Sequence, residues 1–135
     1  MEIKSNWQNG DTFDLLSDYE RIKANINEVY QVSTRVVPNY DITTLGTYDY
    51  TFIPLANFFN DIVNAIDDVY EHSSFKPHDY IELGKVYEGK GQAFSAEDLN
   101  ILELNVYYLY HSFMRIIKCW NRCGYETLGL KGGNF

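Results

Sequence analysis

The apolar residues of this chain recur at a spacing of 40 residues, and this periodicity constrains the fold more than any other feature. Each recurrence has the spacing i, i+3, i+7, i+10, i+11, which lines one face of a helix. The three sets are Tyr19, Ile22, Ile26, Val29, Tyr30; Phe59, Ile62, Ile66, Val69, Tyr70; and Leu99, Leu102, Val106, Leu109, Tyr110. We therefore expect an all-α fold, a three-helix bundle in which each helix completes the core of its neighbours.

The segments between the expected helices recur as well. A Gly-x-x-Phe step ends at Phe13 and at Phe94, and a third one ends the sequence at Phe135. A tyrosine followed by a Leu-Gly pair comes after each helix, at Tyr40, Tyr80 and Tyr125. The sequence thus predicts one domain, 1–135, built from three helix-plus-loop repeats of about 40 residues. They cover approximately 10–46, 52–84 and 91–129, with a partial repeat at 130–135. The alternative is an ordinary bundle whose amphipathic helices share helical spacing without true repetition.

Capping and turn residues set the expected helix boundaries at about 17–31, 54–72 and 95–122. Ser17-x-x-Glu20 has the form of a capping box, and Ser95 is the expected cap of the third helix. The brief alternation between Tyr80 and Tyr87 leaves room for a minor β element in the loops. The expected core consists of the apolar helix positions Ile22, Ile26, Val29, Phe59, Ile62, Ile66, Val69, Leu99, Leu102, Val106, Leu109, Phe113 and Ile117.

Charge and hydropathy limit the partners of the chain. The net charge of −8 disfavours direct binding of nucleic acid, which needs a basic face to neutralise phosphates. The N-terminus lacks the charged start and apolar run of a signal peptide, and no apolar stretch approaches membrane-spanning length. We therefore expect neither a nucleic-acid partner nor a membrane.

Catalytic and metal-binding patterns are not found in the sequence. Cys119 and Cys123 could supply half of a zinc site, but the three histidines offer no partner spacing, so we interpret both as buried, reduced thiols. Glycines around Gly91 lack the Lys-Ser or Lys-Thr step of a phosphate-binding loop. We expect no catalytic residue, no cofactor and no metal, and hence a protein that is not an enzyme.

Tyrosine is unusually abundant, with 12 residues among the 22 aromatic ones, and it suits interfaces that are apolar but partly wet. The alternative is that these rings pack inside the same chain. We predict a protein-protein interface, or a surface that closes the repeats, formed by Trp7, Phe13, Tyr40, Tyr80, Phe94, Tyr125 and the tail ending in Phe135. Asn25 and Asn105 occupy matching helix positions, either to fix register across the bundle or as surface residues at the edge of the apolar stripe.

Two segments resemble a family of known proteins. One runs from Trp7 through Phe13 to Ile26, and the other runs from Gly91 through Phe94 to Leu109. Both are similar to the recurring segment of small tail, baseplate and fibre-associated proteins of tailed bacteriophages. There, a turn with an aromatic residue leads into a helix of the form Asp-Leu-Asn-Arg-Ile-Glu-x-Asn. The chain departs from this pattern at Tyr19 and Glu20, and at Ile101 in place of arginine.

The resemblance implies a non-enzymatic structural subunit that docks onto other virion proteins in an oligomeric assembly, after synthesis in the host cytoplasm. A rival hypothesis is a small phage-encoded inhibitor of a host defence nuclease, which would mimic nucleic acid with acidic side chains gathered on one face. Asp61, Asp67, Asp68 and Glu71 are the candidates for that face. The structural hypothesis instead predicts dispersed acidic groups and an exposed aromatic patch.

Overall fold

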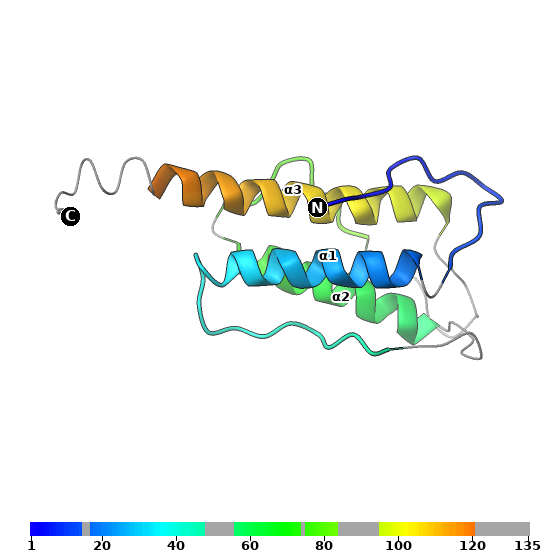
Figure 1. The fold of residues 1–135 in the computed structure, drawn as a ribbon, viewed down its shortest axis with the longest axis horizontal. Coiled ribbons are helices and arrows are strands. Elements are labelled where there is room, and N and C mark those ends of the chain that lie inside the picture. The colour runs from blue at the N-terminus through cyan, green and yellow to red at the C-terminus, as the bar shows by residue number, and fades with distance from the viewer. Residues whose placement is uncertain (15–16, 48–55, 74, 84–94, 121–135) are drawn as a thin grey trace, which may run out of the picture.

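A computed structural model of the chain describes residues 1–14, 17–47, 56–73, 75–83 and 95–120. It contains three helices, α1 (Asp18–Ser33), α2 (Ala56–His72) and α3 (Ala96–Cys119), which pack together as a bundle (Figure 1). The predicted all-α class is therefore confirmed. The described residues contain no strand, so the expected β element is not found at 80–83, and the rest of that stretch lies outside the described residues.

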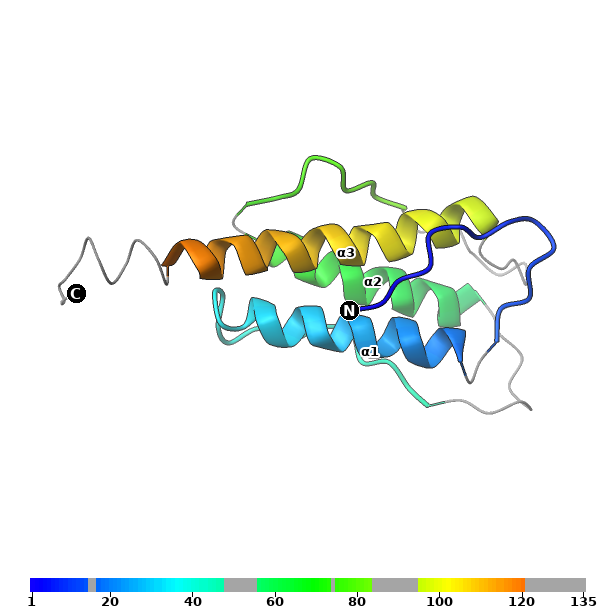
Figure 2. The same cartoon turned by 45° about the horizontal axis from the view of Figure 1, so that its top comes forward.

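All three helices run in the same direction. In both ribbon views the N-terminal ends of α1, α2 and α3 lie at one end of the bundle and their C-terminal ends lie at the other (Figures 1 and 2). Consecutive parallel helices need a connection that returns along the whole bundle, and the chain supplies it as extended segments. The C-terminal end of α3 projects beyond the ends of the other two helices in both views.

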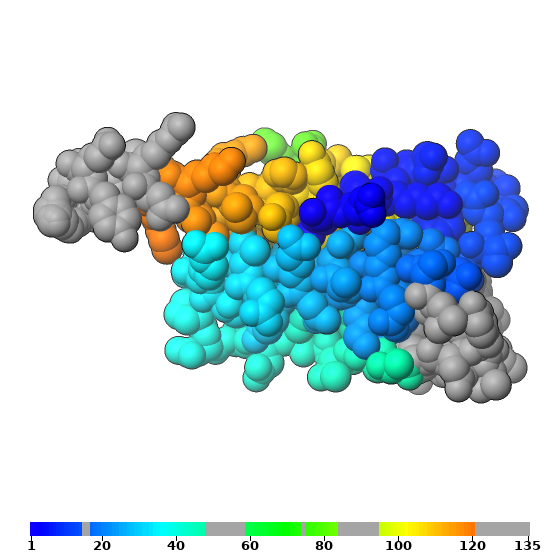
Figure 3. Space-filling model, in the orientation of Figure 1, coloured from blue at the N-terminus to red at the C-terminus, as the bar shows by residue number. Residues whose placement is uncertain are grey.

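Three extended segments lie in the three seams between the helices. The N-terminal segment (1–13) lies between α1 and α3, where Asn25 donates to the Glu2 carbonyl and the Lys4 amide donates to Glu103 (Figure 3). The segment 34–47 lies between α1 and α2, and the segment 75–83 lies between α2 and α3. The hydrogen bonds that hold these two segments are Tyr19 Oη to the Gly46 carbonyl, the Thr43 backbone amide to Asp68, Tyr80 Oη to Asp67, and the Asn105 side-chain amide to the Ile81 carbonyl.

The core is the one that the apolar periodicity predicts. All thirteen expected residues are buried, from Ile22 in α1 to Ile117 in α3. Tyr19 joins them from the first turn of α1, and the rings of Trp7 and Tyr80 join them because the extended segments bring these side chains into the seams. Burial of this continuous apolar surface is the main stabilising contribution to the bundle.

The two predicted helix caps have different outcomes. Ser95 accepts a hydrogen bond from the Asp98 amide, and the Asp98 side chain accepts from the Ser95 amide, so α3 begins with a capping box. The capping box predicted at Ser17 is wrong, because Ser17 has helical backbone angles and makes no side-chain cap bond. Asp14 takes its place: the Asp14 carbonyl accepts from the Asp18 and Tyr19 amides.

Candidate functional site

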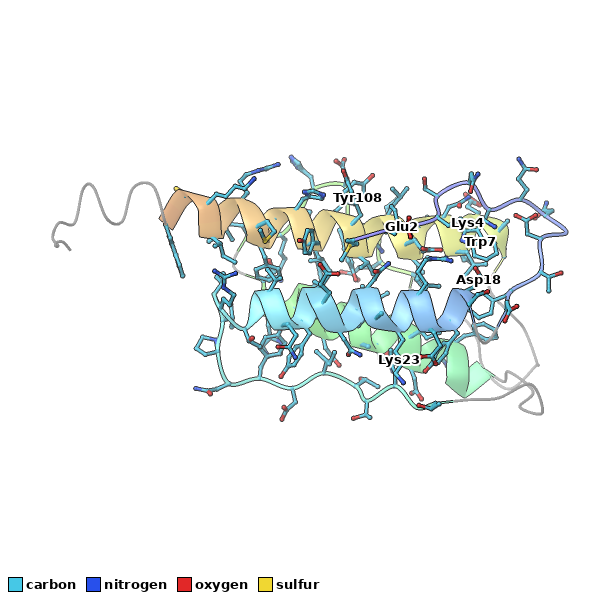
Figure 4. All side chains as sticks on the ribbon, in the orientation of Figure 1. Glu2, Lys4, Trp7, Asp18, Lys23 and Tyr108 are labelled. Atoms are coloured by element: carbon cyan, nitrogen blue, oxygen red, sulfur yellow. The ribbon has the colours of Figure 1, made fainter. Side chains whose placement is uncertain are left out.

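A buried carboxylate ties the N-terminal segment to α1 and α3. The Glu103 side chain is 1% exposed and accepts hydrogen bonds from the Trp7 indole at 2.7 Å and the Lys4 amide at 2.9 Å. The Arg21 guanidinium donates to both of its oxygens, at 2.7 and 3.3 Å. Lys4, Trp7 and Asp18 lie together in Figure 4, toward the end of the bundle at which the helices begin. Every donor in this cluster belongs to the chain itself, so Glu103 has a structural role: it holds the N-terminal segment against α1 and α3.

Arg21 keeps its charge in this cluster. Burial acts to lower the pKa of Arg21, but hydrogen bonds to Glu103 and Asp18 outweigh that effect and raise the pKa. The ion pair with Asp18 has an N–O distance of 2.9 Å. The Glu103 carboxylate is therefore paired with a permanent cation, which offsets the cost of burying it.

Asparagine side chains hold two of the extended segments by their backbone. Asn100 accepts from the Trp7 amide at 2.7 Å and donates to the Trp7 carbonyl at 3.1 Å. Asn105 does the same to Ile81, at 3.0 and 2.7 Å. Asn25 and Asn105 are both buried, so they are not surface residues at the edge of the stripe. Their partners are extended segments, and they fix the position of those segments along the helices.

Tyr40 and Tyr80 close the seams beside α2. Tyr40 stacks on His72 with ring centroids 4.2 Å apart, and its hydroxyl bonds to Ser33. Tyr80 stacks on Tyr70 at 3.9 Å, and its hydroxyl donates to Asp67. Burial raises the pKa of both tyrosines, and the bond to Asp67 raises that of Tyr80 further. Both hydroxyls are therefore neutral hydrogen-bonding groups.

The surface of α3 beside segment 75–83 is hollowed, and this hollow is the candidate functional site. One part, of about 490 Å³, is lined by Phe75, Lys76, Pro77, His78, Asp79, Tyr107, Tyr108, His111, Ser112 and Arg115. A second part, of about 440 Å³, shares Phe75, Ser112 and Arg115 and continues past Ile116 and Cys119 to Trp120. The two parts form one surface that follows α3 from Tyr107 to its projecting end, and we call it the α3 trough. Tyr108 lies midway along α3 and away from the Glu103 cluster in Figure 4.

Exposed apolar side chains concentrate at the trough. Phe75 is 68% exposed, Trp120 is 53% exposed and Tyr107 is 39% exposed. Ile81, in the same extended segment as Phe75, is also exposed. Among the described residues, Met1 is the only other large hydrophobic side chain in this class. Such a concentration makes the trough the candidate for an interaction surface, whereas single scattered apolar side chains need no such explanation.

Comparison with protein-family models, with curated proteins and with solved structures found no match. The described helices include none that is long and apolar enough to cross a membrane. Within the same residues, no three histidine, cysteine, aspartate or glutamate side chains are grouped so that they could hold a metal ion.

Four of the seven predicted interface residues lie among the described residues, and the structure buries three of them fully and Phe13 in part. Trp7, Tyr40 and Tyr80 are at most 9% exposed, and Phe13 packs between the rings of Trp7 and Phe59. Each of these four rings therefore packs within its own chain, as the alternative to an exposed interface expects, and their part in a protein-protein interface or in closing the repeats stays a prediction. Phe94, Tyr125 and Phe135 lie outside the described residues.

The thiol prediction also changes for the described cysteine. Cys119 is exposed at the end of α3, where the helix projects past its neighbours. The expectation of a buried thiol at this position is wrong, and Cys123 lies outside the described residues.

Two features were missed by the sequence reasoning. Glu103 lies four residues after Leu99 and three before Val106, so it falls on the buried face of the helix. A charged residue at a buried position indicates that its charge is paired within the fold, and this pattern could have identified Glu103. The α3 trough could be read only in part, from the tyrosines of the third helix. Its second wall comes from segment 75–83, and no local pattern shows that this segment returns along α3.

Proposed function

We propose that the chain is a non-enzymatic structural protein of the tail or baseplate of a tailed bacteriophage and acts through protein-protein contacts. The observation that carries the contact function is the concentration of Phe75, Tyr107 and Trp120 at the α3 trough. Aromatic side chains of this kind form the anchors of protein interfaces. The assignment to a virion rests on the sequence resemblance of the segments around Phe13 and Phe94.

We also propose that the chain is internally repeated. Tyr40 packs edge-to-face on Tyr30, and Tyr80 stacks on Tyr70, so equivalent residues pair twice at a spacing of 40 residues, with different ring geometry. Asn25 and Asn105 each hold an extended segment that precedes their helix. These matching contacts support three copies of one unit, stacked so that each copy fills a seam of the next.

The rival function, inhibition of a nuclease by an acidic face, gains less support. Asp67 accepts from the Tyr80 hydroxyl, and Asp68 accepts from both the amide and the hydroxyl of Thr43. Two of the four proposed acidic residues are therefore engaged within the fold. Salt separates the hypotheses, because an acidic mimic loses affinity steeply as ionic strength rises, whereas an aromatic interface does not.

The test is peptide mass spectrometry on gradient-purified particles of the phage or prophage that encodes the chain. We expect the protein in the particles at a fixed copy number. We also expect the double substitution Phe75→Ser and Trp120→Ser to abolish incorporation while the protein still accumulates and folds. Presence in infected cells together with absence from particles would contradict the proposal and favour the inhibitor.

A further inference from the structure

We propose that the α3 trough binds an extended, acidic segment of a partner polypeptide, in which a carboxylate pairs with Arg115 and neighbouring apolar side chains contact Phe75, Tyr107 and Trp120. This inference rests on the proposed docking function and names the chemistry of the partner. It is argued from the charge of the trough, from its shape and from the way in which the fold binds its own extended segments.

The charge of the trough is opposite to that of the chain. The protein carries a net charge of −8, yet the residues that line the trough include the cations Arg115 and Lys76 against one carboxylate, Asp79. A locally basic site attracts an acidic segment even where the protein as a whole carries negative charge. Complementarity of charge therefore selects an acidic occupant.

Arg115 is the cation available to that occupant. Lys76 is engaged, because its ammonium group donates to the Tyr70 carbonyl at 2.6 Å and lies over the Tyr70 ring. Arg115 is exposed, and no carboxylate of the described residues forms an ion pair with it. A guanidinium presents a planar fork of donors that matches a carboxylate. The rings of Phe75 and Trp120 lie beside it along the same surface, so an anion and an apolar side chain can be bound together.

The shape of the trough favours an extended chain. It follows α3 from Tyr107 to Trp120, which corresponds to about 20 Å of helix at the usual rise per residue. Segments 1–13, 34–47 and 75–83 already lie along helices of this protein in extended form. Figure 2 shows segment 75–83 running along α3, where it forms one wall of the trough. A partner segment in the trough would lie beside it in the same manner.

The test is an NMR titration of the full-length ¹⁵N-labelled protein with two synthetic peptides. One alternates glutamate with leucine and phenylalanine, and the other has glutamine in place of each glutamate. We expect the acidic peptide to shift the amide signals of residues 75–79 and 107–120 and to bind about tenfold more tightly than the glutamine peptide. Arg115→Glu should weaken the acidic peptide at least about tenfold. Arg35→Glu, an exposed arginine at the end of α1 that does not line the trough, is the matched control and should leave binding unchanged.

Several results would overturn the inference. They are no shift at these residues up to about 1 mM peptide, equal binding of the two peptides, equal binding by the Arg115 variant, or preferential binding of a single-stranded oligonucleotide. The titration uses the isolated protein, so its outcome does not depend on the particle experiment. Peptide binding without incorporation into particles would support the trough as a peptide-binding site and reject the assignment of the chain to a virion.

Discussion

At the residue scale, the described structure depends on polar side chains that hold distant segments together. Glu103 joins three donors that lie 82 to 99 residues away in sequence. A buried carboxylate of this kind is stable only while its partners are present, because an unpaired buried charge costs several kcal/mol. The residues around Glu103 are therefore more sensitive to substitution than their distance from the α3 trough suggests.

Replacement of Glu103 tests this dependence. Glu103→Ala leaves the Trp7 indole without its acceptor and leaves Arg21 with Asp18 as its remaining carboxylate partner. We expect the substitution to lower the free energy of unfolding by about 3–5 kcal/mol. Glu97→Ala, an exposed glutamate in the first turn of the same helix, should cost less than about 1 kcal/mol. Urea unfolding followed by circular dichroism measures both. Equal losses in the two variants would contradict the role of Glu103.

Asp67 makes a pH-dependent contribution. Burial raises the pKa of the folded Asp67 carboxyl above its ordinary value of 3.8, and the hydrogen bond from Tyr80 opposes this rise only in part. The folded state therefore binds the proton more readily than the unfolded state. Hence the stability that this group contributes is present below pH 3.8 and is lost as the pH rises through the folded pKa. We expect wild type to lose stability relative to Asp67→Asn as the pH rises from about 3.5 to about 7, as measured by urea unfolding at each pH. A stability difference that is constant or of opposite slope would reject the assignment.

At the scale of elements, apolar periodicity was sufficient to locate the helices and their buried faces. The predicted boundaries 17–31, 54–72 and 95–122 differ from α1, α2 and α3 by a few residues, because helix ends depend on local caps and on contacts beyond the stripe. Ser95 and Ser17 look alike in sequence, but only Ser95 adopts the extended backbone of a cap. At the start of α1 the backbone of Asp14 satisfies the first amides, so the serine is not needed there.

These two serines provide a matched pair of substitutions. Ser95→Ala removes the acceptor of the Asp98 amide, and we expect a loss of about 1 kcal/mol. Ser17→Ala removes no side-chain cap bond and should change the free energy of unfolding by less than about 0.5 kcal/mol. Chemical denaturation of the two variants under the same conditions gives the comparison. A larger loss at Ser17 than at Ser95 would show that the cap assignments are reversed.

At the scale of the whole molecule, the direction of the helices and the course of the connecting segments could not be predicted from the sequence. A stripe of apolar residues shows which face is buried but does not show whether neighbouring helices are parallel. The direction depends on the extended segments, whose anchors are single residues such as Thr43 and Ile81 bonded to distant helices. The same limitation explains the interface prediction: Tyr40 and Tyr80 look like exposed loop tyrosines until the segments that carry them are placed in the seams.

The N-terminal segment packs against α1 and α3, and we therefore expect it to unfold together with the helices. Trp7→Ala removes a ring that is 4% exposed and should cost about 3–5 kcal/mol, as for other buried aromatic residues. If the segment is part of one cooperative unit, the transitions followed by circular dichroism and by Trp120 fluorescence should move together to lower urea. Gln8→Ala, at the exposed neighbouring position, should leave both transitions in place. Unchanged transitions in Trp7→Ala would mean that the N-terminal segment is not part of the cooperative unit formed by the helices.

The parallel arrangement of the helices gives the molecule an electrical direction. In an up-and-down bundle the dipoles of neighbouring helices cancel, whereas here the three dipoles add (Figure 1). The acidic first turns of α1 and α3 lie at the positive end, and Lys118 lies in the last turn of α3 at the negative end. The two ends of the bundle therefore carry helix-terminal partial charges of opposite sign. Any assembly built from this chain starts from a subunit with two unlike ends.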